Sequence, residues 1–298
     1  MYINDITNSL FNSRIKLFAD DSNLFITSKN IQSLLEIANS QLSNLYKWIS
    51  VNKLYINYEK TNFMLFEPYK RVLKTSDPVI STPLLFNGHT IERVYSVKYL
   101  GVFIDDKLNW VEHINYLINK VSSLTGILYR INHFLPLNCK RNIYFGLIHS
   151  VLTYCIEVYA NVNKSSLKPL IIKCSRLLRM LQFLPRRTPL YDLYSTFGTL
   201  PIDLLFEYHT LKFMNRCFYD SSNIPTISSN LFSRGTHIHT HNTRHRDNFH
   251  IQSKFNPKSI LFYGPSMWAK LPIGLQQNSS LNLFLNTYKQ HLLNSMRL

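Results

Sequence analysis

The sequence has few cysteines, few glycines and few acidic residues, and each shortage excludes a class of protein. Four widely spaced cysteines without a C-x-x-C pair exclude a disulfide scaffold and a locally built zinc ribbon or redox dithiol. We expect these thiols to be reduced and mostly buried. The eight glycines are isolated, so no G-x-G-x-x-G or phosphate-binding loop is present, and H-E-x-x-H and G-x-S-x-G are absent too.

The composition is that of a folded chain with a polyanionic partner. With 45% hydrophobic and 13% aromatic residues among 298, the chain can bury a core in one or two domains. The chain has only 17 acidic residues against 33 basic ones, so its net charge is +16. This excess favours nucleic acid or an anionic membrane surface as a partner. The most apolar window, residues 143–162, contains His149 and Glu157, so we expect no membrane span. The first residues lack the features of a secretory signal, which predicts an intracellular protein, nuclear or cytoplasmic.

The positive charge lies in the second part of the chain. Residues 1–110 carry 12 Lys and Arg against 10 Asp and Glu, whereas residues 111–298 carry 21 against 7. The hydrophobic pattern changes near the same place, so we expect a domain boundary close to Asn109.

Before this boundary the pattern alternates between strand and helix. Apolar residues on either side of Asp20-Asp21-Ser22-Asn23 predict a hairpin over 14–26 that turns at these polar residues. Apolar residues at helical spacing predict a helix over 33–49. Further strands are predicted at 54–57, 63–66 and 97–104, and a hairpin over 84–91 is predicted from Asn87-Gly88.

After the boundary the pattern is helical. Helices are predicted over 114–134, 140–160, 165–184, 200–219 and 281–293, and the Ser-, Asn- and His-rich segment 223–256 predicts a loop. The sequence therefore predicts an α+β fold in three parts: a mixed region over 1–109, a helical basic region over 110–222, and a polar His-rich and C-terminal extension over 223–298.

Two adjacent carboxylates lie at the tip of the first predicted hairpin, in Phe18-Ala19-Asp20-Asp21. Carboxylates held on a rigid hairpin can bind Mg²⁺, and two metal ions clamp the attacking and leaving oxygens in phosphoryl transfer. Asp is also common in turns because it tolerates turn geometry and caps its own backbone. The pair by itself therefore leaves a purely structural role open.

Several short sequence motifs occur along the chain, and their order carries information. They are Tyr2-Ile3-Asn4-Asp5-Ile6, Leu17-Phe18-Ala19-Asp20-Asp21, Trp48-Ile49, Asn52-Lys53-Leu54, Asn57 with Lys60-Thr61, Lys98-Tyr99-Leu100-Gly101-Val102, Leu108-Asn109-Trp110 and, near the C-terminus, Trp268 and Leu271-Pro272. In this order they resemble the reverse transcriptases of non-LTR retrotransposons, particularly the jockey-like LINE group. The first motifs resemble the metal-binding hairpin of the palm, the Lys98–Val102 motif resembles the primer-grip hairpin, and the segment after it resembles the start of the thumb.

The resemblance implies a partial palm, made of an antiparallel sheet and a helix, followed by a mostly helical thumb. It also implies RNA-directed DNA synthesis, in which a DNA primer on an RNA template attacks a deoxynucleoside triphosphate with the help of Mg²⁺ (or Mn²⁺). By this resemblance Asp20 and Asp21 would be metal ligands and Lys60 would assist the pyrophosphate leaving group. Tyr99, Leu100 and Gly101 would support the primer end.

One part of the family pattern is missing. In this family another metal-binding Asp lies on an earlier palm strand, and only 17 residues precede Phe18 here. Asp5 lies in a motif that matches a different family position. We therefore expect the C-terminal part of a reverse transcriptase, without fingers and without part of its active site. The alternatives are a catalytically inactive nucleic-acid-binding remnant, or a chain that does not fold alone.

Two further clusters stand out. Basic residues concentrate in the helical region and are expected to contact template and primer phosphates, the alternative being a solvated cationic face. They are Lys168, Lys173, Arg176, Arg179, Arg186 and Arg187. His237, His239 and His241 alternate and could offer imidazoles to Zn²⁺ or Cu²⁺ on one face of a strand. No nearby Cys or Glu completes a ligand set, so we expect a solvated loop.

Overall fold

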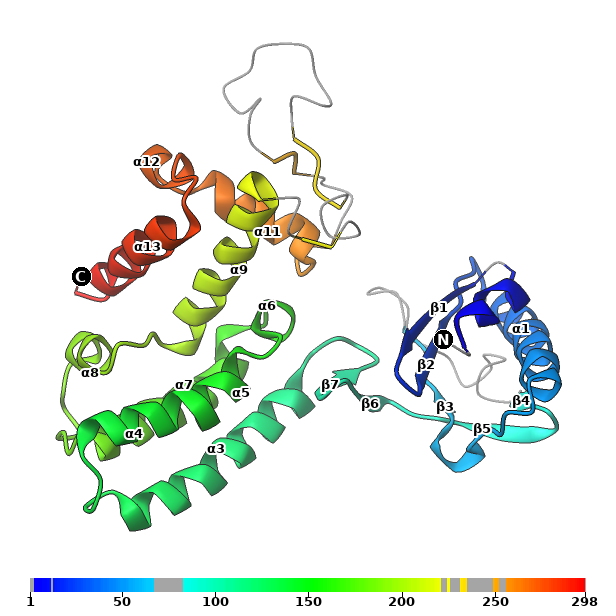
Figure 1. Cartoon of the computed structure of the whole chain (residues 1–298), viewed down its shortest axis with the longest axis horizontal. Coiled ribbons are helices and arrows are strands. Elements are labelled where there is room, and N and C mark those ends of the chain that lie inside the picture. Colours follow the sequence, from blue (N-terminus) through cyan, green and yellow to red (C-terminus); the bar gives the residue numbers. More distant parts are fainter. Residues whose placement is uncertain are drawn as a thin grey trace. The chain divides into compact units, whose positions relative to one another are not determined.

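The computed structural model describes residues 3–11, 13–66, 83–220, 224–225, 231–234, 249–251 and 256–297. The chain divides into two compact units, Met1–Leu108 and Asn109–Leu298 (Figure 1). Small sheets and one long helix make up the described part of the first unit, and helices make up nearly all of the second. The mixed α and β class predicted from the sequence is confirmed.

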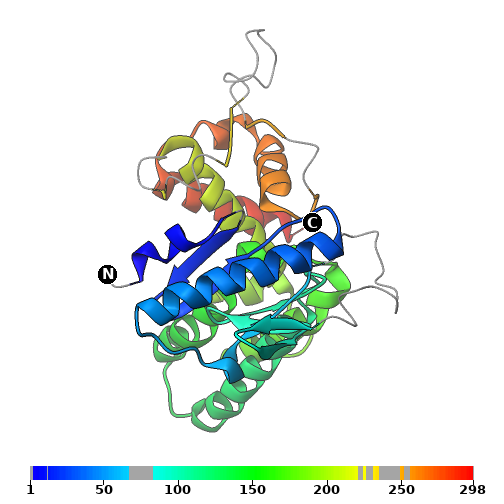
Figure 2. The same cartoon turned by 90° about the vertical axis from the view of Figure 1, so that its right-hand side faces the viewer.

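The first unit is built around one long helix. Strands β1 (Arg14–Phe18) and β2 (Asp21–Phe25) pair antiparallel, and α1 (Ile31–Val51) follows them. Figure 2 shows α1 as the long helix that crosses this unit. The Asn30 side chain caps α1 by accepting a hydrogen bond from the Ser33 N–H at 2.7 Å. The helix predicted over 33–49 is thus confirmed.

The core of this unit lies between α1 and a second small sheet. Buried residues from the 3-10 helix η1 (Asn4–Ser9), α1, β4 (Leu84–Phe86) and β5 (His89–Arg93) form one cluster, and Ile15 and Leu17 of β1 pack against it. Strand β5 pairs antiparallel with β4 and parallel with the two-residue strand β3 (Asn62–Phe63). The hairpin predicted from Asn87-Gly88 is confirmed, with φ of 51° and 79° at these two residues.

Two strand predictions are wrong. The stretch 97–104 is not one strand, as the hydrophobic pattern predicted, but a hairpin of β6 (Ser96–Tyr99) and β7 (Val102–Asp105), because Leu100 and Gly101 turn the chain with φ of 46° and 86°. The resemblance at Lys98–Val102 implied a hairpin here. Residues 54–57 belong to no strand of the described sheets, and Tyr55 is fully exposed. Of the strand predicted at 63–66, only Phe63 lies in a strand, β3.

The second unit is a stack of helices. In chain order these are α3 (Val111–Ile131), α4 (Leu137–Ile143), the π-helical segment η3 (Tyr144–His149), α5 (Ser150–Thr153), α6 (Ile156–Tyr159), α7 (Lys164–Leu181), α8 (Leu190–Phe197), α9 (Ile202–Tyr219), α11 (Ile260–Ala269), α12 (Ile273–Gln276) and α13 (Leu281–Ser295). Helices α3 and α7 lie side by side (Figure 1), and α9 packs against α6, α11 and α13. None of the helices that the structure describes is long and apolar enough to cross a membrane.

The helix predictions are confirmed where the apolar pattern is long. The structure interrupts the helix predicted over 140–160 with η3 and with a break at Cys155, whose φ is 55°. Helices α8 and α11 were not predicted. The cysteines form no disulfide, but Cys139 is exposed and Cys155 half-buried, so the expectation of mostly buried thiols is wrong for these two. The loop and metal predictions for His237, His239 and His241 lie outside the described residues.

The end of α8 joins three helices. Gly198 follows α8 with φ of 76°, and a Cβ there would collide with the Arg141 guanidinium. Arg141 of α4 donates from Nε to the Phe197 carbonyl at 2.8 Å, and Lys289 of α13 donates from Nζ to the Gly198 carbonyl at 2.7 Å. Two cations thus meet the negative end of the α8 dipole.

Candidate functional site

The first candidate feature is the turn between β1 and β2. Phe18 pairs with Asp21, so Ala19 and Asp20 form a two-residue turn in which φ is 50° at Ala19. The turn predicted at Asp20-Asp21-Ser22-Asn23 therefore lies too far along the chain, and Asp21 begins β2. This register lets Ile15 and Leu17 face the core. Because side chains alternate between the two faces of a strand, Asp21 lies on the exposed face, opposite Phe18 and diagonal to Lys16.

The two carboxylates are open to a ligand. Asp20 and Asp21 are both exposed, and neither side chain accepts a hydrogen bond from any residue that the structure describes. Their oxygens are of the type that Mg²⁺ prefers. Among the described residues, however, no three His, Cys, Asp or Glu side chains come close enough to hold a metal ion together. The two carboxylates are therefore ligands of the type that Mg²⁺ takes, and they would provide part of the coordination of one ion.

Lys60 lies in a different part of the first unit. It ends the 3-10 helix η2 (Tyr58–Lys60), its side chain is exposed, and its N–H donates to Asn57 Oδ1 at 3.2 Å. In the described part of the chain no ion pair or hydrogen bond joins Lys60 to Asp20 or Asp21. The structure therefore shows no contact that brings the three predicted catalytic residues together.

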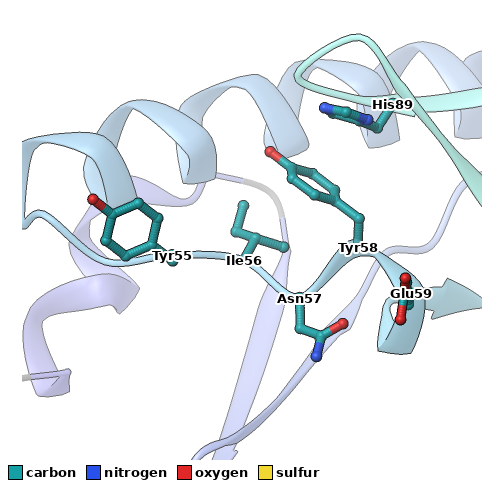
Figure 3. Close-up of a pocket in the computed structure, with 6 residues that line it drawn as sticks. All are labelled: Tyr55, Ile56, Asn57, Tyr58, Glu59 and His89. Carbon is teal, nitrogen blue, oxygen red and sulfur yellow. The ribbon is translucent and has the colours of Figure 1, made fainter.

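An open depression of about 590 Å³ lies at the start of η2, on residues that precede Lys60 in the chain (Figure 3). Its lining residues are Tyr55, Ile56, Asn57, Tyr58, Glu59 and His89. The Tyr58 and His89 rings stack with centroids 4.1 Å apart, and the Tyr58 ring also meets the Phe86 ring edge-on. Neither Asp20 nor Asp21 lines this depression, so it is separate from the carboxylate pair.

The residues predicted to support a primer end lie together at one hairpin tip. Tyr99 is the last residue of β6, and Leu100 and Gly101 make the turn to β7. Tyr99 and Leu100 are half-buried and Gly101 is exposed. Positive φ at both turn residues matches the twist of the paired strands, so the tip is a tight turn rather than a loose loop.

The predicted basic cluster follows α7. Helix α7 has no Asp or Glu among its 18 residues, and its apolar side is buried. Lys164, Lys168 and Arg176 are exposed on the other side, with Lys164 and Lys168 one helical turn apart; we call these three residues the α7 cationic strip. Lys173 is half-buried on the same helix. Lys164 was not predicted, although it fits the spacing.

The remaining predicted cations lie at the end of α7. Arg186 and Arg187 are exposed in the loop that follows the helix. Arg179 is half-buried and donates to the Thr188 carbonyl at 3.4 Å, so it ties this loop to the helix. Five of the six predicted cations are therefore at least partly available to a ligand, and Arg179 has a structural contact.

Curated relatives share part of this chain. It is 29% identical over 175 residues to the RNA-directed DNA polymerase from mobile element jockey of Drosophila melanogaster, a match that covers 57% of this chain and 18% of that protein. It is 25% identical over 167 residues to the Retrovirus-related Pol polyprotein from type-1 retrotransposable element R1 of Bradysia coprophila, covering 55% and 16%. A probable RNA-directed DNA polymerase from transposon BS of Drosophila melanogaster is 22% identical over 213 residues, covering 67% and 22%. The resemblance to non-LTR retrotransposon reverse transcriptases is confirmed.

The likeness to these reverse transcriptases is partial. The matched stretch spans about a fifth of the length of each relative. No protein-family model matches the chain, and no solved structure matches it.

Sequence reasoning missed a group of side chains at the end of α7. Phe134 and Phe183 are large, exposed apolar residues, and Lys140 lies over the Phe183 ring. The one signal available in the sequence was a phenylalanine directly after the last helical turn and two residues before Pro185. That position usually favours glycine, so a phenylalanine there is unusual.

Proposed function

We propose that this chain provides the Asp-Asp hairpin, and the helical region after it, of an RNA-directed DNA polymerase of a non-LTR retrotransposon. The observation that carries the proposal is the exposed Asp20–Asp21 pair at the tip of the β1–β2 hairpin, in a chain similar to three such polymerases. Since each relative matches over about a fifth of its length, the activity of the whole polymerase is part of the proposal.

In this proposal Asp20 and Asp21 hold Mg²⁺ (or Mn²⁺). Asp21 is fixed by its pairing with Phe18, and Asp20 by the turn, so both carboxylates are preorganised. The bound metal would offset the negative charge that develops on the phosphates of a deoxynucleoside triphosphate when the primer 3′-hydroxyl attacks. A further carboxylate ligand is required from outside the described residues. Lys60 assists the pyrophosphate leaving group in the same proposal.

The helical unit holds the RNA template and the DNA primer. The α7 cationic strip, together with Arg186 and Arg187, meets their phosphates, while the Tyr99–Gly101 tip supports the primer end. Phosphate contacts of this kind carry no sequence information and weaken as salt is added. Lys168→Glu with Arg176→Glu should therefore lower affinity for any nucleic acid and flatten its salt dependence.

A second function is favoured by one observation. The described residues contain no group of three metal ligands. A chain that cannot hold a catalytic metal pair would still bind nucleic acid through α7. In that case the protein is an inactive nucleic-acid-binding remnant of a retroelement.

Primer extension on an RNA template, with Mg²⁺ or Mn²⁺, separates the two functions. Wild type is compared with Asp20→Asn, Asp21→Asn and the matched control Asp192→Asn, an exposed carboxylate in the first turn of α8. Extension that is lost in the first two variants and kept in the third supports the polymerase. Salt-sensitive binding without extension supports the remnant. Folded protein that neither extends a primer nor binds nucleic acid contradicts both.

A further inference from the structure

An exposed aromatic group lies where α7 ends. Phe183 directly follows Gln182, the C-cap residue of α7, and the Phe183 side chain is 58% exposed. The His133 ring lies 5.1 Å from the Phe183 ring between centroids, and Phe134 next to it is 84% exposed. We call His133, Phe134, Lys140 and Phe183 the aromatic corner. Large apolar side chains that remain this exposed need an explanation, because burying them from water would be favourable.

The backbone holds Phe183 in a conformation that glycine usually adopts. Its φ is 54°, its N–H donates to the Met180 carbonyl at 3.2 Å, and the Leu184 N–H donates to the Arg179 carbonyl at 2.9 Å. These two bonds define a Schellman ending, in which the left-handed residue is most often glycine. A phenylalanine is strained at this φ, and such strain is often retained for function.

The corner is also held by hydrogen bonds between helices, and a buried lysine lies against the Phe183 ring. The Lys140 ammonium lies 4.0 Å from the Phe183 ring centroid and donates to the Leu181 carbonyl at 3.2 Å. Asn132, at the end of α3, donates from Nδ2 to the Met180 carbonyl at 2.8 Å. These contacts tie α3 and α4 to the end of α7. Little ordering is then left to occur on binding, which favours affinity.

The α7 cationic strip leads toward this corner. Lys168 and Arg176 are eight residues apart on one helix, a rise of about 12 Å along its axis. Arg186 and Arg187 continue the positive charge just beyond Phe183. The arrangement of cations followed by exposed rings is that of single-strand binding surfaces, where phosphates meet cations and bases stack on aromatic faces.

We propose that the aromatic corner stacks an unpaired base of a single-stranded nucleic acid whose phosphates lie along α7. The inference rests on the proposed nucleic-acid binding of the helical unit and adds a preference within it. A base in a duplex already stacks on its neighbours and cannot lie on Phe183. The corner therefore selects single strands, or a single-stranded overhang, over a blunt duplex. An acidic peptide would satisfy the cations but would leave the aromatic rings without a flat partner.

Fluorescence anisotropy of the full chain tests the preference. The probes are a fluorescein-labelled single-stranded DNA of about 15 nucleotides, a length within the range of single-strand sites, and a blunt duplex of the same sequence. Phe183→Gly should weaken binding of the single strand on the order of tenfold, which corresponds to ~1.4 kcal/mol. It should leave duplex binding unchanged. Phe183→Tyr, which keeps a ring, should retain single-strand affinity.

The choice of glycine guards against misfolding as a cause. A glycine at this position would adopt the native φ without strain, so the Phe183→Gly variant should melt no lower than wild type. Tyr55→Ala removes a fully exposed ring from the other unit and should change neither affinity.

The following results would overturn the inference. The first is a Phe183→Gly variant that binds the single strand as wild type does, or that loses affinity for both probes equally. The second is competition by polyglutamate as effective as competition by unlabelled single strand, which would show that any polyanion suffices. If wild type binds neither probe, the proposed function fails as well. If only Lys168→Glu with Arg176→Glu weakens binding, the proposed function stands and the aromatic corner has no part in it.

Discussion

We expect acid to destabilise the helical unit through a buried histidine of α3. His113 is 2% exposed, and its ring meets the edge of Tyr159, with centroids 4.8 Å apart. Burial lowers the pKa of His113 from 6.5 to about 4. Between these two pH values the unfolded chain takes up a proton that the folded chain does not. The stability is therefore complete above pH 6.5 and is lost as the pH falls toward 4.

The size of the loss follows from the two pKa values. The free energy of unfolding falls by up to ~1.4 kcal/mol for each pH unit, and the loss reaches ~2 kcal/mol at pH 5. Burial also lowers the pKa of His149 and of His209 to about 4. These two groups add their own losses in the same pH range. The loss of unfolding free energy that is due to His113 is therefore measured as the difference between wild type and a variant that lacks this histidine.

His113→Phe isolates that share, because it keeps an aromatic ring and removes the titrating group. Urea unfolding is followed by far-ultraviolet circular dichroism at pH 7 and at pH 5. Wild type should lose ~2 kcal/mol more than His113→Phe between the two pH values. His133→Phe, which removes an exposed imidazole, is the matched control and should behave as wild type. Equal losses in wild type and His113→Phe would refute the reasoning.

Three further substitutions test local energetics by urea unfolding. Asn30→Ala removes the cap that accepts from the Ser33 N–H and should cost ~1 kcal/mol; an unchanged midpoint would show that the cap contributes nothing. Lys53→Gly should stabilise the chain by ~1 kcal/mol, because Lys53 ends α1 with φ of 57° and is exposed; a loss of stability would contradict the strain. Leu170→Ala should cost on the order of 2–5 kcal/mol, since Leu170 is fully buried on α7; a cost below ~1 kcal/mol would mean that the helix is loosely packed.

Turn prediction succeeded where the turn residues themselves carry the signal. Asn87 and Gly88 both accept positive φ, so the hairpin they form was predicted. At the first hairpin the polar residues Asp20 to Asn23 gave the stronger local signal, yet the chain turns at Ala19-Asp20. Burial of Ile15 and Leu17 decides the register, and burial is a tertiary effect that local propensity does not contain.

Other features depend on packing that the sequence pattern does not reveal. Helix α11 contains Gly264 and Pro265, which locally oppose a helix, but it buries Trp268 completely. Adjacent Asp20 and Asp21 were found from sequence because they are neighbours in the chain. The tie between Arg179 and Thr188 was not, since Arg179 has the same residue type and spacing as the exposed cations of α7.

The junction at Gly198 decides how far the helical unit can be shortened in the laboratory. Lys289 reaches this junction from α13, and the same helix places Phe284 against Trp268, with ring centroids 5.9 Å apart. Tyr288 stacks on Phe284 at 5.6 Å. A chain cut before Leu281 would expose a tryptophan and leave the Gly198 carbonyl without its lysine. Expression trials of the helical unit should therefore keep every residue through Ser295, because the side chains of α13 form part of the buried core.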